Sequence, residues 1–90
     1  MTYRILLSTP ARRALESQLP EAVAAACHEF IQGALAENPR RVGKQLGPPH
    51  YPYYAARRGD FRVVYDIRDE EVVIEVITIM HRRDVYRTPS

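Results

Sequence analysis

The sequence has little sulfur and no tryptophan. A single cysteine, Cys27, occurs among its 90 residues, which excludes an internal disulfide and fits a reducing compartment. No apolar run reaches the roughly 20 residues that a membrane-spanning helix needs. The first ten residues also lack the small-residue pattern of a signal-peptide cleavage site. We therefore expect a cytoplasmic protein that is not attached to a membrane.

Standard catalytic and metal-binding motifs are missing as well. The chain contains no glycine-rich phosphate loop, no Gly-x-Ser-x-Gly motif and no pair of histidines at metal-ligand spacing. His28 falls on the polar side of a predicted helix, where a histidine is solvated, and Cys27 falls on its apolar side. The carboxylates at residues 69–71 fit a hairpin turn. We therefore expect no metal site and no cofactor.

Length and charge distribution say more about a partner. Ninety residues, 46% of them hydrophobic, predict one folded domain over residues 1–90 with a modest core. The net charge of +2 indicates little, but the charges are unevenly placed. Residues 39–65 hold six basic side chains and one acidic, residues 66–77 hold one basic and five acidic, and residues 78–90 hold three basic and one acidic. Two basic segments predict a patch that faces a polyanion.

The first half of the chain predicts a strand followed by two helices. Apolar residues alternate over residues 3–7, as in a half-buried strand. Ser8-Thr9-Pro10 then predicts a helix start with Thr9 as the cap, and this helix ends near Leu19. An apolar stripe at helical spacing predicts a second helix from about Glu21 to Glu37.

The second half predicts a loop and three strands. Residues 39–53 are rich in glycine and proline, which is typical of a loop. Strands are expected at residues 54–58, 61–67 and 72–80, joined by short turns into an antiparallel meander. The resulting order, β-α-α-β-β-β, predicts an α+β fold in which a helical hairpin covers one face of a small twisted antiparallel sheet.

Alternation within residues 61–67 singles out one arginine. Phe61, Val63 and Tyr65 share an apolar side that should face the helices, so Arg62 should lie on the open face of the sheet. Five other residues could join it there, although each of them taken alone is more often a solvated or edge-packed side chain. They are Lys44, His81, Arg82, Arg83 and Tyr86.

Together these residue types fit one chemistry. Guanidinium groups bind phosphate oxygens and stabilise the extra negative charge of a phosphorane. A histidine or tyrosine can move a proton, and aromatic rings can stack on bases. This equipment is typical of a metal-free ribonuclease in which the 2′-hydroxyl of the RNA attacks the neighbouring phosphate.

Three stretches resemble one known family. They are NPRRVGKQLGPP at residues 38–49, YAARRGDFRVVYDI at residues 54–67 and VVIEVITIMHRRDVY at residues 72–86. With the β-α-α-β-β-β order, they resemble the RelE/ParE superfamily of bacterial toxins, and the RelE branch in particular. The resemblance implies the toxin of a type II toxin–antitoxin system. Such a toxin enters the A site of the 70S ribosome and cuts mRNA without a metal, leaving a 2′,3′-cyclic phosphate.

The resemblance also assigns roles to residues. It implies catalytic roles for the mid-strand Arg62, for Arg82 after the final strand, for the closing Tyr86 and for the loop lysine, Lys44. His81 stands where relatives carry a lysine or another residue, and the general acid and base stay open. Contacts to ribosomal RNA are implied for the remaining arginines of the motifs, Arg40, Arg41, Arg57, Arg58 and Arg83.

Partners follow from the same resemblance. A RelB-like antitoxin, partly disordered alone, would wrap the toxin and cover or distort its basic face. Operator DNA would be bound only through the antitoxin. Two other functions remain open on this fold: inhibition of DNA gyrase without catalysis, as in the ParE branch, and a degenerate toxin that only binds antitoxin.

Overall fold

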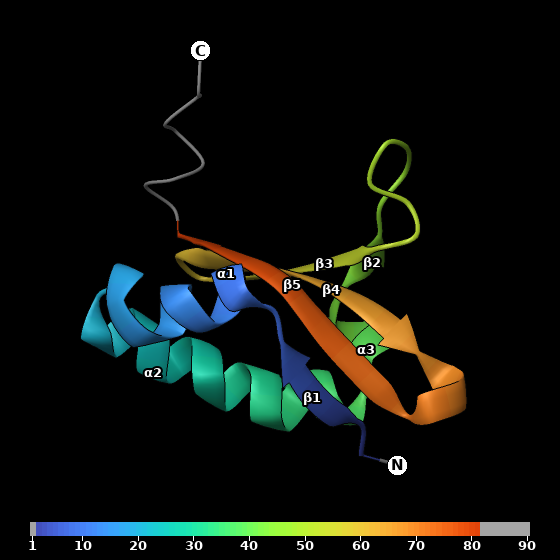
Figure 1. Cartoon of the computed structure of the whole chain (residues 1–90), viewed down its shortest axis with the longest axis horizontal. Coiled ribbons are helices and arrows are strands. Elements are labelled where there is room, and N and C mark those ends of the chain that lie inside the picture. Colours follow the sequence, from blue (N-terminus) through green and yellow to red (C-terminus); the bar gives the residue numbers. More distant parts are fainter. Residues whose placement is uncertain (1, 82–90) are drawn as a thin grey trace.

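A five-stranded sheet packed against a helical layer forms the protein (Figure 1). The computed structural model describes residues 2–81. In chain order the elements are β1 (Arg4–Leu7), α1 (Thr9–Arg13), a π-helical turn (Ala14–Gln18), α2 (Glu21–Phe30), a second π-helical turn (Ile31–Leu35), α3 (Pro39–Val42), β2 (Lys44–Gln45), β3 (Tyr54–Arg58), β4 (Phe61–Arg68), a 3-10 turn (Asp69–Glu71) and β5 (Val73–His81). None of the described helices is long and apolar enough to cross a membrane.

The sheet confirms the predicted α+β class and corrects one detail. Its strand order is β1-β5-β4-β3-β2, and the predicted meander of β3, β4 and β5 is antiparallel. However, β1 pairs with β5 in parallel, so a wholly antiparallel sheet was wrong. The alternating pattern of a strand does not specify the direction of its partner, because hydrophobic period two is common to both pairings.

Residues 39–53 are also more regular than the expected loop. Pro39 begins the short helix α3, where its missing N–H costs nothing. The next residues form β2, which pairs with β3 at the edge of the sheet. Gly43 joins the two elements, and a Cβ there would lie 2.8 Å from the Ala55 carbonyl oxygen and closer still to the Tyr65 hydroxyl. Only glycine fits this close approach, which a propensity pattern does not reveal.

The cap of the first helix differs from the expectation by one residue. Ser8, not Thr9, is the N-cap: its Oγ accepts a hydrogen bond from the Ala11 N–H at 3.2 Å. The same hydroxyl donates to the Ile77 carbonyl oxygen at 2.5 Å. Ser8 therefore caps the helix and also fixes the start of the helix to β5.

The core lies between the helices and one face of the sheet. Phe61, Val63 and Tyr65 are buried there, as predicted. They pack with apolar residues of α2 and the following turn, namely Cys27, Phe30, Ile31 and Leu35. Burial raises the pKa of the Cys27 thiol to about 12, while His28 is exposed. Cys27 is thus in the core and His28 on the surface, as their positions on the helix predicted.

Candidate nucleic-acid interface

The face of the sheet opposite the helices carries three cations at one end. Arg62 of β4 lies directly across from Arg57 of β3 and from Met80 of β5. Because directly paired residues point to the same face, these side chains share the open side. Lys44 of β2 pairs with Ala55, two residues before Arg57, and so lies on this side too. We call Lys44, Arg57 and Arg62 the basic face.

No salt bridge joins the basic face to a carboxylate of residues 2–81. Lys44 and Arg57 are exposed and Arg62 is half-buried, and none of the three forms a salt bridge with a described carboxylate. Like charges directly opposite in a sheet destabilise it, with Cβ atoms about 4.5–5.5 Å apart. An anion bound over Arg57 and Arg62 would relieve that repulsion, so this end of the face is suited to phosphate.

At the other end of the open face, an arginine has carboxylate partners within the fold. Arg68 of β4 contacts the Glu75 carboxylate, and its Nε lies 3.6 Å from Asp66 Oδ2. Asp66 and Glu75 are themselves opposite each other in the β4–β5 register. One arginine thus lies beside two of the five carboxylates of residues 66–77.

Arg40 lies apart from the basic face. Its guanidinium forms two hydrogen bonds with the Asp69 carboxylate, at 3.0 and 2.5 Å, and the Tyr3 hydroxyl donates to the same group at 2.8 Å. These bonds, with Arg40 the larger cause, lower the pKa of Asp69 to about 2. The cluster ties β1 and α3 to the turn before β5, and Arg40 is engaged there.

Two further predicted residues point to the helix side. Arg58 lies with its guanidinium carbon 4.9 Å from the centroid of the Phe30 ring, as in a cation–π contact. His81 pairs with Phe61, whose side chain faces the helices. Alternation therefore places His81 on the opposite side of β5 from Met80. The structure does not bring either residue next to Arg62.

The remaining predicted residues fall in other places. Arg41, at the end of α3, lines a small hollow together with Arg57 and Arg58. Arg82, Arg83 and Tyr86 lie outside the described residues. Within the described part of the chain, no three His, Cys, Asp or Glu side chains are grouped as a metal site would require.

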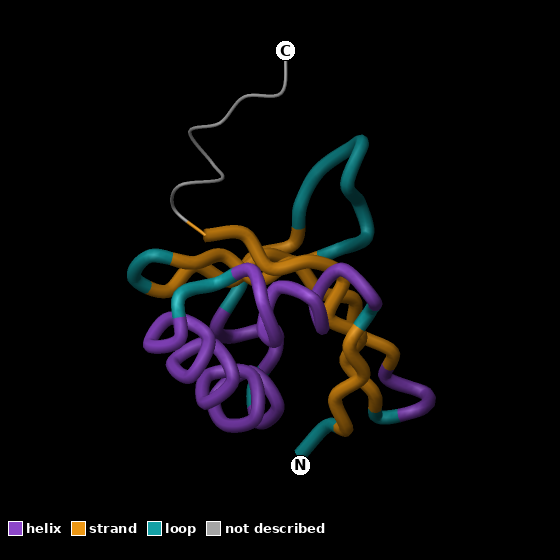
Figure 2. The backbone as a smooth tube through the Cα atoms, turned by 60° about the vertical axis from the view of Figure 1, so that its left-hand side comes forward, coloured by secondary structure: helices purple, strands orange, loops and turns teal. Residues whose placement is uncertain are grey.

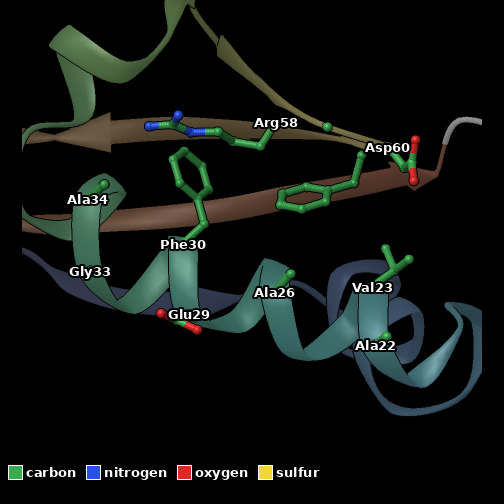
Figure 3. Close-up of a pocket in the computed structure, with 11 residues that line it drawn as sticks. Ala22, Val23, Ala26, Glu29, Phe30, Gly33, Ala34, Arg58 and Asp60 are labelled. Atoms are coloured by element: carbon green, nitrogen blue, oxygen red, sulfur yellow. The ribbon is translucent and has the colours of Figure 1, made fainter.

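An apolar groove of about 690 Å³ runs on the helix side, between α2 and the turn that joins β3 to β4 (Figure 3). Phe30 projects from α2 toward the strands, below Arg58, and Asp60 lies at the end of the groove (Figure 3). Small residues of the helical layer leave room there: Ala22, Ala26, Gly33 and Ala34. The groove and the basic face are therefore separate surfaces.

One exposed aromatic residue was missed by sequence reasoning. Tyr51 is 63% exposed in the loop over residues 46–53. This loop rises from the sheet on the side away from the helices (Figures 1 and 2). A tyrosine among prolines directly after the basic segment was the available signal, but proline-rich composition alone indicates only a loop.

Comparison with known proteins points to one family of toxins. A family model described as the ParE toxin of type II toxin–antitoxin systems matches residues 5–86. Toxin RelE of Mycobacterium tuberculosis is 45% identical over 85 residues, covering 94% of this chain and 87% of that protein. Toxin RelG of the same organism is 40% identical over 87 residues, covering 97% and 99%.

A solved structure shows the same fold. The toxin–antitoxin complex RelBE2 of Mycobacterium tuberculosis contains a chain that matches with a TM-score of 0.87 and 38% identity, covering 91% of this chain and all of that one.

Proposed function

Since this chain belongs to the ParE toxin family and is a type II toxin–antitoxin toxin of the RelE kind, we propose that it is a ribosome-dependent mRNA endonuclease. The observation that carries the proposal is the half-buried Arg62, which lies near the start of β4 opposite Arg57 and forms no salt bridge with a described carboxylate. A guanidinium held on a strand and not paired with a described carboxylate would be able to bind the oxygens of a transferring phosphate.

The proposed reaction uses a nucleophile that belongs to the RNA. The 2′-oxygen attacks the adjacent phosphorus and loses its proton to a base, while the 5′-oxygen of the next nucleotide leaves and takes up a proton. The products are a 2′,3′-cyclic phosphate and a 5′-hydroxyl. Arg62 stabilises the charge that develops on the phosphorane oxygens, and Lys44 and Arg57 hold neighbouring phosphates.

Residues beyond the described part complete the proposal. The family resemblance assigns a second phosphate contact to Arg82 and stacking or proton transfer to Tyr86. His81 starts from the helix side of β5, so it is the weaker candidate for the proton transfers. Arg41, Arg57 and Arg83 fit contacts with ribosomal RNA, because such contacts need charge more than fixed geometry.

Replacing Arg62 tests the assignment. Arg62→Ala is expected to reduce mRNA cleavage on programmed ribosomes by about 100- to 1,000-fold, as for the loss of one preorganised transition-state donor. Primer extension on the mRNA measures the effect. Arg12→Ala, which removes an exposed arginine of α1, is the matched control and should cleave normally. Equal cleavage by both variants would exclude Arg62 from the site, and arrest of DNA replication with intact mRNA would favour gyrase inhibition.

We also propose an antitoxin as the partner that neutralises this chain. The similar RelBE2 chain was solved in a toxin–antitoxin complex, and this chain offers two separate surfaces to such a partner. Acidic residues would cover the basic face, and apolar residues would fill the groove beside Phe30.

A charged substitution in the groove tests whether antitoxin binding uses the groove while cleavage does not. Ala26→Asp, on the groove wall, should weaken antitoxin binding because it buries an unpaired carboxylate against the partner. Cleavage by the free toxin should stay normal. Isothermal titration with the antitoxin measures the first effect; unchanged affinity would exclude the groove from the interface.

A further inference from the structure

The loop over residues 46–53 is held in one shape by its own backbone. The Leu46 N–H donates to the Tyr53 carbonyl oxygen at 2.8 Å and closes the base of the loop. The N–H groups of His50 and Tyr51 both donate to the Gly47 carbonyl oxygen, at 3.0 and 3.2 Å. Prolines at positions 48, 49 and 52 restrict the chain further. Little conformational entropy remains for a ligand to remove.

This rigid loop presents one large ring to solvent. Tyr51 is the most exposed large apolar side chain in the described part of the protein, at 63% against 44% for Leu6. Among residues 2–81 no ring packs on it and its hydroxyl has no hydrogen-bond partner. A tyrosine with no partner in the fold leaves both its π-face and its hydroxyl available to a ligand.

The loop that carries Tyr51 extends from the strand that carries Lys44 of the basic face. The loop follows β2 directly, and β2 carries Lys44. Lys44 pairs with Ala55, which precedes the Arg57–Arg62 pair by about 7 Å of strand. The loop rises away from the helical layer, toward the space above the open face (Figure 2). The loop that carries the exposed ring therefore begins next to Lys44, and the Arg57–Arg62 pair lies two residues farther along the strands.

We propose that Tyr51 is a stacking platform for an unpaired base of the RNA that the basic face binds. This inference rests on the proposed endonuclease function and adds a binding residue to it. A phosphate on Arg57 and Arg62 and a base on Tyr51 together match the two chemical parts of a single-stranded nucleic acid.

A nucleic acid fits this surface better than a protein partner. No described carboxylate neutralises the three cations beside the loop, and aromatic rings interleaved with basic residues bind single strands without sequence preference. The apolar surface suited to a protein lies elsewhere, in the groove beside α2.

Binding to a substrate that cannot react tests the platform apart from catalysis. The probe is a 70S ribosome programmed with mRNA whose 2′-hydroxyls in the A site are methylated. Tyr51→Ala should weaken toxin binding by about 5- to 150-fold, the range for one stacked base. Tyr51→Phe keeps the ring and should bind as the wild type does. Wild-type affinity of Tyr51→Ala would overturn the proposal.

Abasic mRNA identifies the base. One base of the mRNA is removed at a time. At one position, removal of the base should weaken binding of the wild-type toxin about as much as Tyr51→Ala does, and it should not weaken binding of Tyr51→Ala any further. If Tyr51→Ala binds more weakly than the wild type with every abasic mRNA, the stacked base belongs to ribosomal RNA. Tyr51 is then still a stacking platform, with ribosomal RNA as its ligand.

The outcomes separate this proposal from the endonuclease function. A wild-type chain that binds the ribosome but leaves ordinary mRNA intact overturns the endonuclease and leaves the platform standing. A chain that does not bind the ribosome overturns both. Loss of antitoxin binding by Tyr51→Ala with normal ribosome binding would show that the ring meets protein, and overturns the platform alone.

Discussion

Arg62 and Arg68 lie on the same strand and the same face of the sheet, yet their surroundings are opposite. Arg68 contacts two carboxylates, Asp66 and Glu75. Arg62 has another arginine, Arg57, directly across from it. The paired arginine belongs to the fold, because its charge is compensated within the protein. Arg62 forms no salt bridge with a carboxylate of residues 2–81, and its repulsion with Arg57 would be relieved by a bound anion.

The largest effect is expected from replacing Arg62 by a carboxylate, which gives Arg57 the kind of partner that Arg68 has. Arg62→Glu places a carboxylate opposite Arg57 and makes a cross-strand pair of opposite charge. Cleavage of mRNA should fall by about 100- to 1,000-fold or more, while the melting temperature should stay level or rise. Cleavage and thermal unfolding of the same preparation measure both. Retained cleavage would show that the basic face does not meet phosphate.

The second prediction removes the paired arginine. Arg68→Ala leaves Asp66 and Glu75 facing each other without a cation between them. Unfolding free energy should fall by about 1 kcal/mol, since the ion pair is partly exposed and like charges then oppose. Cleavage should remain normal. Urea denaturation measures the stability. If Arg68→Ala lost cleavage without losing stability, the idea that Arg68 serves the fold and Arg62 the substrate would be wrong.

The third prediction concerns salt. Each phosphate contact contributes about 0.7 to the slope of log affinity against log salt for a single strand. Lys44→Ala should therefore flatten the salt dependence of ribosome binding by about that amount, and Arg68→Ala should leave the slope unchanged. Binding titrations between low and physiological salt supply the slopes. Equal slopes for both variants would contradict a contact at Lys44.

The smallest effect is expected at the exposed Arg40–Asp69 pair. The pKa of Asp69 in the fold is about 2, against 3.8 for the free group. Its ionised form therefore stabilises the fold above pH 4, and this contribution is lost as pH falls through 2. Asp69→Asn should lower the melting temperature at pH 7 and have progressively less effect toward pH 2. A constant difference across this range would exclude the ion pair as its cause.

Local patterns were sufficient for most of the architecture. Apolar alternation correctly predicted β3, β4 and the burial of Phe61, Val63 and Tyr65. Helical spacing correctly placed the second helix. These predictions were correct because a strand or helix buries one side, and the spacing of its apolar residues can be seen in the local sequence. The cap at Ser8 was missed because its hydroxyl also bonds to Ile77, far along the chain.

Charges were harder to assign than burial. The run of arginines at residues 57–58 suggested two similar phosphate contacts, but alternation along β3 sends Arg58 over Phe30 and leaves Arg57 on the open face. The parallel pairing of β1 was likewise invisible, because period two does not encode strand direction. Both features depend on which neighbours a residue meets across the fold.

By itself the sequence determined that Arg62 faces away from the core, because its neighbours Phe61 and Val63 must be buried. Only the tertiary structure decided which arginines remain available. Arg40 forms a salt bridge with Asp69, and Arg68 forms one with Glu75 on the neighbouring strand. Arg57 and Arg62, in contrast, lie opposite each other on paired strands. Electrostatic pairing depends on distances between atoms in space, and those distances exist only after the strands have been brought into register.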